Sequence, residues 1–479
     1  MKYFVLGIDA ASDGLLVRQN MTKLKSRIDG FAAPPIELDL FSRGWVDMYT
    51  GQHAMHSGGY YEKPYIDGSF AWSKSFNHSE LPPEKCNRPI WEILNDRNYS
   101  VGIMNIPTTS PAPSVNGFFV AGGGGGADIV QGVAEKHCFS DEIRSYLNSM
   151  GYILDERVPS LLWERKIFDP DKLIDRLIEM NKRRVESYLF LEKSHQVDFG
   201  FLVFRSVAVV EYLACAEMTR YKENSGEVNH QLAEAIDRFY LSLDGLFEKL
   251  LNDLNPENYA VVSDHGLVPK THKVNINLAL QKGGLFVPAK TGLFELKRMR
   301  HLVPYSLRKL MKKNRSISAV YQRTVPFSKQ NTTAFNMTNM GAISGIYLND
   351  SRFFGAVSEK DKAVLVSNIV ELINANKTLE EYDIKAEPNK RSEAKAEFSD
   401  YEPDIWINLP EGFVMDHSGA ELLENCNQSF RPINLKEVVD DNWTGTKSRF
   451  PMARFSHPVS LETGKDMTVV YDAVLEALA

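Results

Sequence analysis

Short, uninterrupted apolar runs alternate with longer amphipathic stretches along most of this chain. The runs Tyr3–Ile8 (YFVLGI), Phe199–Phe204 (FGFLVF) and 259–262 (YAVV) are rich in aromatic and β-branched residues. Such runs are typical of strands that are buried on both faces of a parallel sheet. Residues 14–28 and 227–254 have the mixed apolar and charged pattern of helices. Strands that alternate with helices predict a doubly wound α/β sheet flanked by helices.

The second half of the chain continues this pattern. Residues 343–349 and 404–409 predict further strands, and residues 360–375 predict a helix. Because 479 residues exceed the size of a typical single domain, we expect a large core with a smaller inserted or C-terminal lobe. The predicted division is a core that contains the site (1–285), an inserted or cap region (286–400) and a C-terminal part that returns to the core (401–479).

Polar residues follow two of the predicted strands. Asp264 and His265 come after the 259–262 run, and Asp9 comes directly after Tyr3–Ile8. In open α/β sheets, ligands bind in the crevice at the carboxyl ends of the strands. Two carboxylates and an imidazole at that place suit Zn²⁺ or Mn²⁺ better than Ca²⁺. The structural alternatives are a helix N-cap for Asp264 and a turn at His265.

Two further polar residues are candidates for the reacting site. Ser42 precedes a segment in which apolar and aromatic residues recur at helical spacing. Its hydroxyl predicts either an ordinary helix N-cap or a nucleophile that a metal and the helix amino end activate. Arg205 follows the Phe199–Phe204 run and therefore belongs to the carboxyl end of another predicted strand.

Composition narrows the classes of partner. The net charge of −7 and the sequence pI near 5.9 give no support for nucleic-acid binding through a global basic field. No stretch of the sequence approaches the roughly 20 uninterrupted apolar residues that span a bilayer. Asp9 interrupts an apolar start that is too short for a usual signal peptide. The four scattered cysteines predict a reducing, cytoplasmic compartment.

Two segments of biased composition give weaker signals. Five glycines that begin at Gly122 look like a phosphate-binding loop, but no Lys-Ser/Thr pair follows them, so we interpret them as a flexible loop. The strongly basic segment 297–315 is interpreted as a solvated helical face. Contact with an anionic substrate, a partner or a membrane surface is the alternative role for this segment.

Several motifs in a fixed order resemble a known family. They are GIDAAS, FSRGWVDMYTGQHAMHSGG, PIWEILNDRNYSVGIMNIP, PSVNGFFVAG, VVSDHG, VNINLAL, MGAISGIYLND and PDIWINL. From about Tyr3 to about Lys447, the chain resembles the type I phosphodiesterase/nucleotide pyrophosphatase family of the alkaline phosphatase superfamily. The resemblance implies an alkaline phosphatase-like fold. It also implies cleavage of phosphodiesters or pyrophosphates with two metal ions and a Thr or Ser nucleophile.

The resemblance implies specific roles for residues of this chain. Asp9, Asp264 and His265 match the ligands of the metal ion that also contacts the nucleophile. Ser42 is the nearest candidate nucleophile, although Phe41 occupies the position that the family's nucleophile normally takes. The resemblance therefore implies a divergent member of the family.

The chain departs from the family pattern at the second metal site, where the positions of the three ligands carry Ala208, Tyr212 and Lys447. One interpretation is a one-metal enzyme in which Lys447, with Arg205 or Arg43, binds the anion in place of the lost ion. The related sulfatases resemble this solution. We therefore predict a hydrolase or transferase with one divalent metal, Zn²⁺ first and Mn²⁺ second, and a small anionic phosphate or sulfate ester as substrate.

Two alternatives to the one-metal enzyme stay open on the sequence. The first is a catalytically silent or ligand-binding homologue that has lost the second metal site. The second is a conventional two-metal phosphodiesterase in which His417 or His457 replaces a missing ligand.

Overall fold

The computed structural model describes residues 1–82, 88–123, 132–289, 327–337, 343–390, 396–417, 419–438, 443–459 and 466–479. The basic segment 297–315 and most of the glycine run that begins at Gly122 lie outside the described residues. Within those ranges, no helix combines the length and the apolar character needed to cross a membrane.

A mostly parallel six-stranded sheet forms the centre of the larger lobe, in the order β17-β7-β1-β6-β4-β5. Strand β1 lies between β6 and β7, and its Tyr3 pairs with Phe199 on one side and Asn258 on the other. Because these three strands are parallel, the residues that follow them lie at the same edge of the sheet. The strand bounds are β1 Tyr3–Ile8, β4 Val101–Met104, β5 Gly117–Val120, β6 Phe199–Phe204, β7 Asn258–Val262 and the antiparallel β17 Ala453–Phe455.

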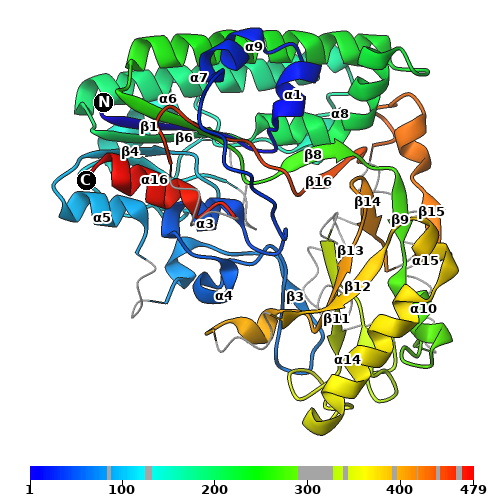
Figure 1. Cartoon of the computed structure of the whole chain (residues 1–479). Coiled ribbons are helices and arrows are strands. Elements are labelled where there is room, and N and C mark those ends of the chain that lie inside the picture. The colour runs from blue at the N-terminus through cyan, green and yellow to red at the C-terminus, as the bar shows by residue number, and fades with distance from the viewer. Residues whose placement is uncertain are drawn as a thin grey trace.

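Helices cover both faces of this sheet (Figure 1). Alternate residues of β1 face opposite layers, with Phe4, Leu6 and Ile8 in one apolar core and Tyr3 and Val5 in the other. The first layer contains α1 Asp13–Arg18, α2 Thr22–Ile28, α6 Asp141–Ser149, α7 Pro170–His195, α8 Ser206–Glu223 and α9 His230–Leu254. The second contains α3 Gly44–Thr50, α5 Ile90–Asp96 and α16 Val469–Ala477. The doubly wound α/β prediction is confirmed.

The amphipathic stretch 14–28 is divided into two helices. The first, α1, ends at Arg18, and Asn20 has a left-handed backbone with φ +54° before α2 begins at Thr22. The backbone N–H groups of Lys23 and Leu24 donate to the carboxylate of Asp244 on α9, at 3.0 and 2.9 Å. This carboxylate accepts from backbone N–H groups that the first turn of a helix leaves without a partner, which stabilises the start of α2.

A smaller lobe lies beside the main sheet and is built mostly of antiparallel strands (Figure 1). Its four-stranded sheet has the order β10-β11-β13-β12, with β10 Ala334–Phe335, β11 Ile343–Leu348, β12 Lys385–Pro388 and β13 Ile405–Asn408. A three-stranded sheet contains β9 His272–Val274, β14 Phe413–Met415 and β15 Leu423–Asn425. The apolar core of this lobe also includes side chains of α10 Ile276–Lys282, α14 Glu359–Asn374 and α15 Lys377–Glu381.

The chain passes from the larger lobe to the smaller one after β8 (Gly266–Pro269) and returns through β16 (Gly445–Ser448) to β17. Strands β13, β14 and β15 follow residue 400 and pair within the smaller lobe. The division into residues 1–285, 286–400 and 401–479 stays a prediction.

Contacts in both directions join the lobes. A hairpin of β2 (Lys63–Pro64) and β3 (Trp72–Ser73) reaches from the larger lobe, and Phe70 between its strands joins the apolar core of the smaller lobe. In the other direction, the backbone oxygen of Phe398 accepts a hydrogen bond from the Tyr60 hydroxyl at 3.0 Å. The Phe398 N–H donates to the carbonyl of Met55 on α4 (Ala54–Ser57) at 3.0 Å.

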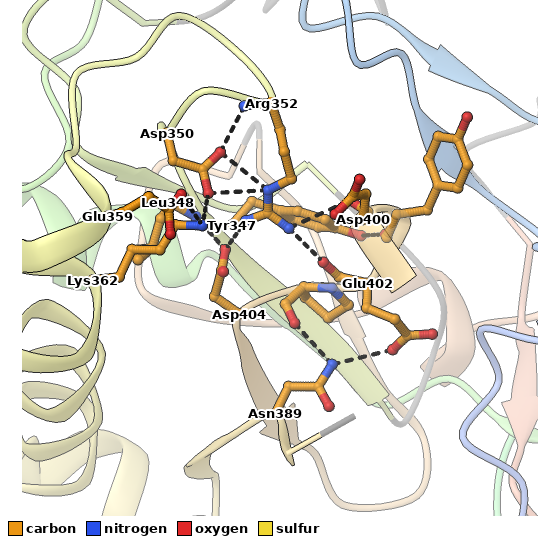
Figure 2. A network of polar contacts seen from close by, with 12 residues as sticks. Tyr347, Leu348, Asp350, Arg352, Glu359, Lys362, Asn389, Asp400, Glu402 and Asp404 are labelled. Atoms are coloured by element: carbon orange, nitrogen blue, oxygen red, sulfur yellow. Dashed lines mark hydrogen bonds and ion pairs between the residues drawn. The ribbon is translucent and has the colours of Figure 1, made fainter. Parts of the chain in front are cut away.

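A charged network supports the smaller lobe's side of this contact (Figure 2). Arg352 donates from Nε to both carboxylate oxygens of Asp350, at 3.0 and 3.1 Å, and from its terminal nitrogens to Asp404 and to the Glu402 carbonyl. Lys362 of α14 forms a second ion pair with Asp350 at 2.6 Å. Asp350 is fully buried, and its two cationic partners offset the cost of removing its charge from water.

Candidate metal centre

The polar residues that follow β1 and β7 converge on one buried point. One ligand atom from each of Asp9, Asp264 and His265 lies within 4.8 Å of the other two, and all three residues are buried. The convergence follows from the sheet order, because Gly7 of β1 pairs with Val262 of β7. Both carboxylates therefore face one crevice. Strand β8 follows directly at Gly266, so the helix N-cap interpretation of Asp264 is wrong.

Each carboxylate has one oxygen that is satisfied by the protein. Oδ2 of Asp9 accepts from Nε of Arg205 at 3.2 Å, and Oδ2 of Asp264 accepts from the Tyr61 hydroxyl at 2.6 Å. In contrast, Oδ1 of Asp264 is buried and has no hydrogen-bond partner among the described residues. A buried carboxylate oxygen without a donor is costly, and a bound cation would remove that cost.

The imidazole of His265 is oriented for the same role. Its Nδ1 lies 2.9 Å from the carbonyl oxygen of Gly266, which can only accept, so Nδ1 carries the hydrogen. The lone pair of Nε2 is then free, and Nε2 lies 3.6 Å from Oδ2 of Asp264 and 3.9 Å from Oδ1 of Asp9. A metal-binding histidine usually donates its other nitrogen in this way. Two carboxylates and one imidazole fit Zn²⁺ or Mn²⁺.

Burial sets the protonation of these three ligands. Burial, and then the neighbouring Asp264 carboxylate, raises the pKa of Asp9 to about 6. Burial also raises the pKa of Asp264 above its ordinary value. Burial, and then the Lys447 ammonium, lowers the pKa of His265 to about 3, so the imidazole is neutral at pH 7. A neutral imidazole beside two carboxylates is the state that binds a cation.

The affinity of this site for a cation should fall as the pH drops below the pKa of Asp9, which is about 6. Below that value the carboxyl holds a proton, which must leave before a cation binds. The dissociation constant for Zn²⁺ should then increase by up to about tenfold for each further pH unit. Titration of metal-free protein against a competing indicator measures this constant, with circular dichroism to check the fold at each pH. A constant that does not change across this range would show that Asp9 is not a ligand.

Two basic side chains lie beside the cluster. Lys447 on β16 pairs with Leu267 of β8, and its Nζ lies 2.9 Å from the centroid of the Tyr61 ring. Burial lowers the pKa of Lys447 to about 7. Arg205 donates to Asp9 through Nε and forms an ion pair with the buried Asp155 through Nη1. The structure therefore brings both predicted basic residues to the same edge of the sheet.

The hydroxyl of Ser42 has other partners. It donates to Oδ1 of Asp47 at 2.5 Å and accepts from the Ala54 N–H at 2.8 Å. Arg43, not Ser42, is the N-cap of α3, so the N-cap interpretation is wrong. Among the described residues, no hydrogen bond joins the Ser42 side chain to the three ligands. Its role as nucleophile stays a prediction.

Two of the three positions where the resemblance implies ligands of a second metal ion, those of Ala208 and Tyr212, lie in an apolar contact. Ala208 packs with Ala10 and Leu267 in a small buried cluster, and Tyr212 packs against it. The Tyr212 ring lies edge-on to His265, with the ring centroids 6.2 Å apart. Within the parts of the chain that the structure describes, the three ligands above are the one group able to hold a metal.

Neither histidine considered as a replacement ligand belongs to this group. Nε2 of His457 lies 2.9 Å from the Tyr3 hydroxyl, at the start of β1. Asp9 follows the other end of that strand, about 20 Å away at a rise of about 3.3 Å per residue. His417 follows β14 in the smaller lobe.

The structure also shows two residues that the sequence did not single out. Tyr61 is hydrogen-bonded to Asp264 across 203 positions of sequence, and Asp155 pairs with Arg205 across 50. No local pattern marks either contact. The one sequence signal near Tyr61 is its position after a Gly-Gly pair in a loop, which is common at turns.

Comparison with protein families identifies one matching model, described as type I phosphodiesterase/nucleotide pyrophosphatase, over residues 44–432. Comparison with curated proteins gave no match.

Solved structures with the same fold include phosphonoacetate hydrolase from Sinorhizobium meliloti 1021. Its complex with phosphonoacetate has a TM-score of 0.57 and its complex with phosphonoformate 0.54, both at 11% identity and covering 100% of this chain and 96% of that chain. Murine ectonucleotide pyrophosphatase/phosphodiesterase 5 matches with a TM-score of 0.45, 10% identity and coverage of 100% and 95%. The family match extends over most of the chain, which therefore belongs to the type I phosphodiesterase/nucleotide pyrophosphatase family.

Proposed function

We propose that this protein is a hydrolase or transferase of phosphoesters that works with one divalent cation. Asp9, Asp264 and His265 are proposed to hold the cation. Family membership supports enzyme activity on phosphoesters. The observation that carries the proposal is the buried set of ligand atoms within 4.8 Å, one of whose carboxylates has an oxygen without a partner. Zn²⁺ is the proposed ion and Mn²⁺ the alternative, because mixed carboxylate and imidazole ligands suit both.

Lys447 and Arg205 are proposed to bind the anionic group that is transferred. A bound divalent cation would polarise one oxygen of that group. The Lys447 ammonium would neutralise a second oxygen in a partly dry site, where electrostatic stabilisation is strongest. Arg205 adds positive charge at the same edge while its Nε keeps Asp9 in place.

Arg43, the alternative anion-binding residue, is committed elsewhere. Its guanidinium donates to the backbone carbonyls of Tyr60, Tyr61 and Lys74, at 2.8, 3.2 and 2.7 Å. These bonds favour a structural role for Arg43.

For the nucleophile, Ser42 is the proposed residue. It lies two positions before Gly44, where an added Cβ would be 2.6 Å from the backbone oxygen of Asp264. The α3 amino end is therefore packed directly against a proposed ligand. To attack phosphorus, the Ser42 oxygen must pass its proton to the Asp47 carboxylate or to water and turn toward the proposed cation. As its bond to phosphorus forms, the bond from phosphorus to the ester's leaving oxygen breaks, and the leaving group departs with a proton from solvent.

One ion rather than two is supported by the packing around Ala208 and Tyr212. These residues offer no carboxylate or imidazole, and they pack against Ala10 and Leu267. A second metal ion would need carboxylate or imidazole ligands, and Ala208 and Tyr212 do not supply them at these two positions. The cationic function of that ion passes to Lys447 in this proposal.

The proposed substrate is a small anionic phosphate ester, with a sulfate ester as the alternative. The solved structures of the same fold hold phosphonoacetate and phosphonoformate, which are small phosphorus-containing anions. The net charge of −7 gives no support for nucleic-acid binding through a global basic field, so no nucleic-acid partner is proposed. The proposed compartment is the cytoplasm, which suits the free thiols of Cys138, Cys215 and Cys426.

Metal analysis together with a substrate screen tests this proposal. Purified protein should contain about one transition-metal ion per chain. It should hydrolyse at least one of an aryl phosphate, a phosphodiester, a nucleotide pyrophosphate and a sulfate ester. Chelation should abolish that activity, and Zn²⁺ or Mn²⁺ should restore it. Acid quenching during turnover should leave a phosphorylated peptide that contains Ser42.

Each other outcome contradicts a named part of the proposal. Two metal equivalents after exhaustive dialysis would show a rebuilt second site. Turnover without a modified Ser42 peptide would assign the attack to water. A protein that binds no metal and cleaves none of the esters would be a catalytically silent homologue.

A further inference from the structure

The Tyr61 hydroxyl is hydrogen-bonded to one proposed metal ligand and is assigned no role by the reaction. It donates to Oδ2 of Asp264 at 2.6 Å, while Oδ1 of the same carboxylate has no partner. We propose that Tyr61 is a positioning residue that fixes the rotation of the Asp264 carboxylate, so that a single oxygen of this carboxylate binds the cation. The inference rests on the proposed one-metal function.

The backbone of Tyr61 is held in place from several sides. Its N–H donates to the carbonyl of Phe41 at 2.9 Å, and its own carbonyl accepts from Arg43 Nη2 at 3.2 Å. The Arg43 N–H in turn donates to the carbonyl of Gly59 at 2.9 Å. The loop that carries Tyr61 is therefore tied to the segment that leads into α3.

The other end of the hydrogen bond is tied to the same segment. At Gly44, the first residue of α3, a Cβ would lie 2.6 Å from the backbone oxygen and 2.8 Å from the Cα of Asp264. Only glycine allows this approach of the helix to the ligand's backbone. Donor and acceptor are thus both fixed relative to α3, so the hydroxyl can hold the carboxylate at a defined angle.

The Tyr61 ring does not depend on this hydrogen bond for its packing. The Lys447 ammonium lies over the ring at 2.9 Å from its centroid, and the Arg43 guanidinium lies over it at 5.1 Å. Cation–π contacts of this kind orient an aromatic ring without its hydroxyl. Removing the oxygen alone should therefore leave the ring, and Lys447 above it, in place.

The consequence of the hydrogen bond lies in the choice between the two carboxylate oxygens. With Oδ2 hydrogen-bonded to the phenol, the carboxylate is held at one rotation and presents a single oxygen to the cation. Without the phenol, both oxygens are free, and the carboxylate can rotate or bind through both. Groups that orient a metal ligand through a hydrogen bond typically change metal affinity by about 10- to 100-fold.

The variant Tyr61→Phe tests this inference, with Tyr60→Phe as the matched control. Tyr60 also loses a hydroxyl bond of ordinary length, at 3.0 Å to the Phe398 carbonyl, but that bond does not touch the three ligands. Zn²⁺ affinity is measured on metal-free protein by competition with a chelator. We expect Tyr61→Phe to bind Zn²⁺ about 10- to 100-fold more weakly than the wild type, and Tyr60→Phe to bind it equally well.

The absorption spectrum of the Co²⁺-loaded proteins supplies a second readout. The visible bands of Co²⁺ weaken when its coordination number rises, so a carboxylate that binds through two oxygens should lower the absorption of Tyr61→Phe alone. Melting temperatures of the metal-free variants check that both fold.

The outcomes separate this inference from the proposed function. If the wild type binds Zn²⁺ and Tyr61→Phe binds it equally well with an unchanged Co²⁺ spectrum, the positioning role is overturned and the metal site stands. Equal weakening by both tyrosine variants would mean a general structural effect and would also overturn it. A wild type that binds no divalent cation would overturn the proposed function and this inference together.

Discussion

Replacing Asp264 by asparagine should remove the bound cation and lower phosphoester hydrolysis by about a thousandfold or more. Asparagine keeps the size of the side chain but is a much poorer ligand than a carboxylate for a divalent ion. Asp264 contributes the buried oxygen that has no hydrogen-bond partner in the described part of the chain, so loss of this carboxylate affects the cation first. Metal analysis and the rate on the best ester from the screen measure the two effects.

The stability of the metal-free variant distinguishes loss of the site from loss of the fold. Burial raises the pKa of Asp264, so its charged form destabilises the folded protein at pH 7. The metal-free Asp264→Asn protein should therefore melt at the same temperature as the metal-free wild type, or higher. A variant that keeps its metal and its activity would exclude Asp264 as a ligand.

The variant Lys447→Met should reduce turnover by roughly a hundredfold or more and leave the metal content unchanged. Methionine preserves the length and the apolar stem of the side chain and removes only the charge. Burial lowers the pKa of Lys447 to about 7, so its ammonium is partly desolvated. A cation in that state stabilises a developing negative charge more strongly than a solvated one does.

Lys273→Met provides the matched control for this prediction. Lys273 also lies on a short strand, and it pairs with Asp416 at 3.2 Å in the smaller lobe, away from the three ligands. The Lys273→Met variant should retain full activity. If Lys447→Met is as active as the parent enzyme, the charge of Lys447 has no part in catalysis and the one-metal mechanism loses its second cation.

The sequence predicted the elements of the fold that depend on local pattern. Uninterrupted apolar runs such as Tyr3–Ile8 and Phe199–Phe204 became neighbouring central strands, and the side chains that follow them meet at one edge. The break at Asn20 was missed because it depends on the Asp244 carboxylate, which caps the second helix from a distant part of the chain. Amphipathic spacing alone does not distinguish one helix from two.

The candidate site was predictable only as far as strand ends determine it. Asp9 and Asp264 are placed by the parallel register of β1 and β7. The strand register does not place the residues that orient these carboxylates. Tyr61, for example, reaches Asp264 from a loop whose position depends on hydrogen bonds to Phe41 and Arg43. Such contacts follow from tertiary packing, for which a single sequence contains no periodic signal.

The position of β17 has a consequence for the protein during its synthesis. The Ser263 N–H and hydroxyl, directly after β7, bond with Met452, which lies 189 residues further along the chain. Until the ribosome has released that segment, the outer edge of β7 has no partner and can pair with other chains. The pairing of the strand that leads to Asp264 is therefore completed late in translation. Until then, a nascent chain of this protein presents an open sheet edge.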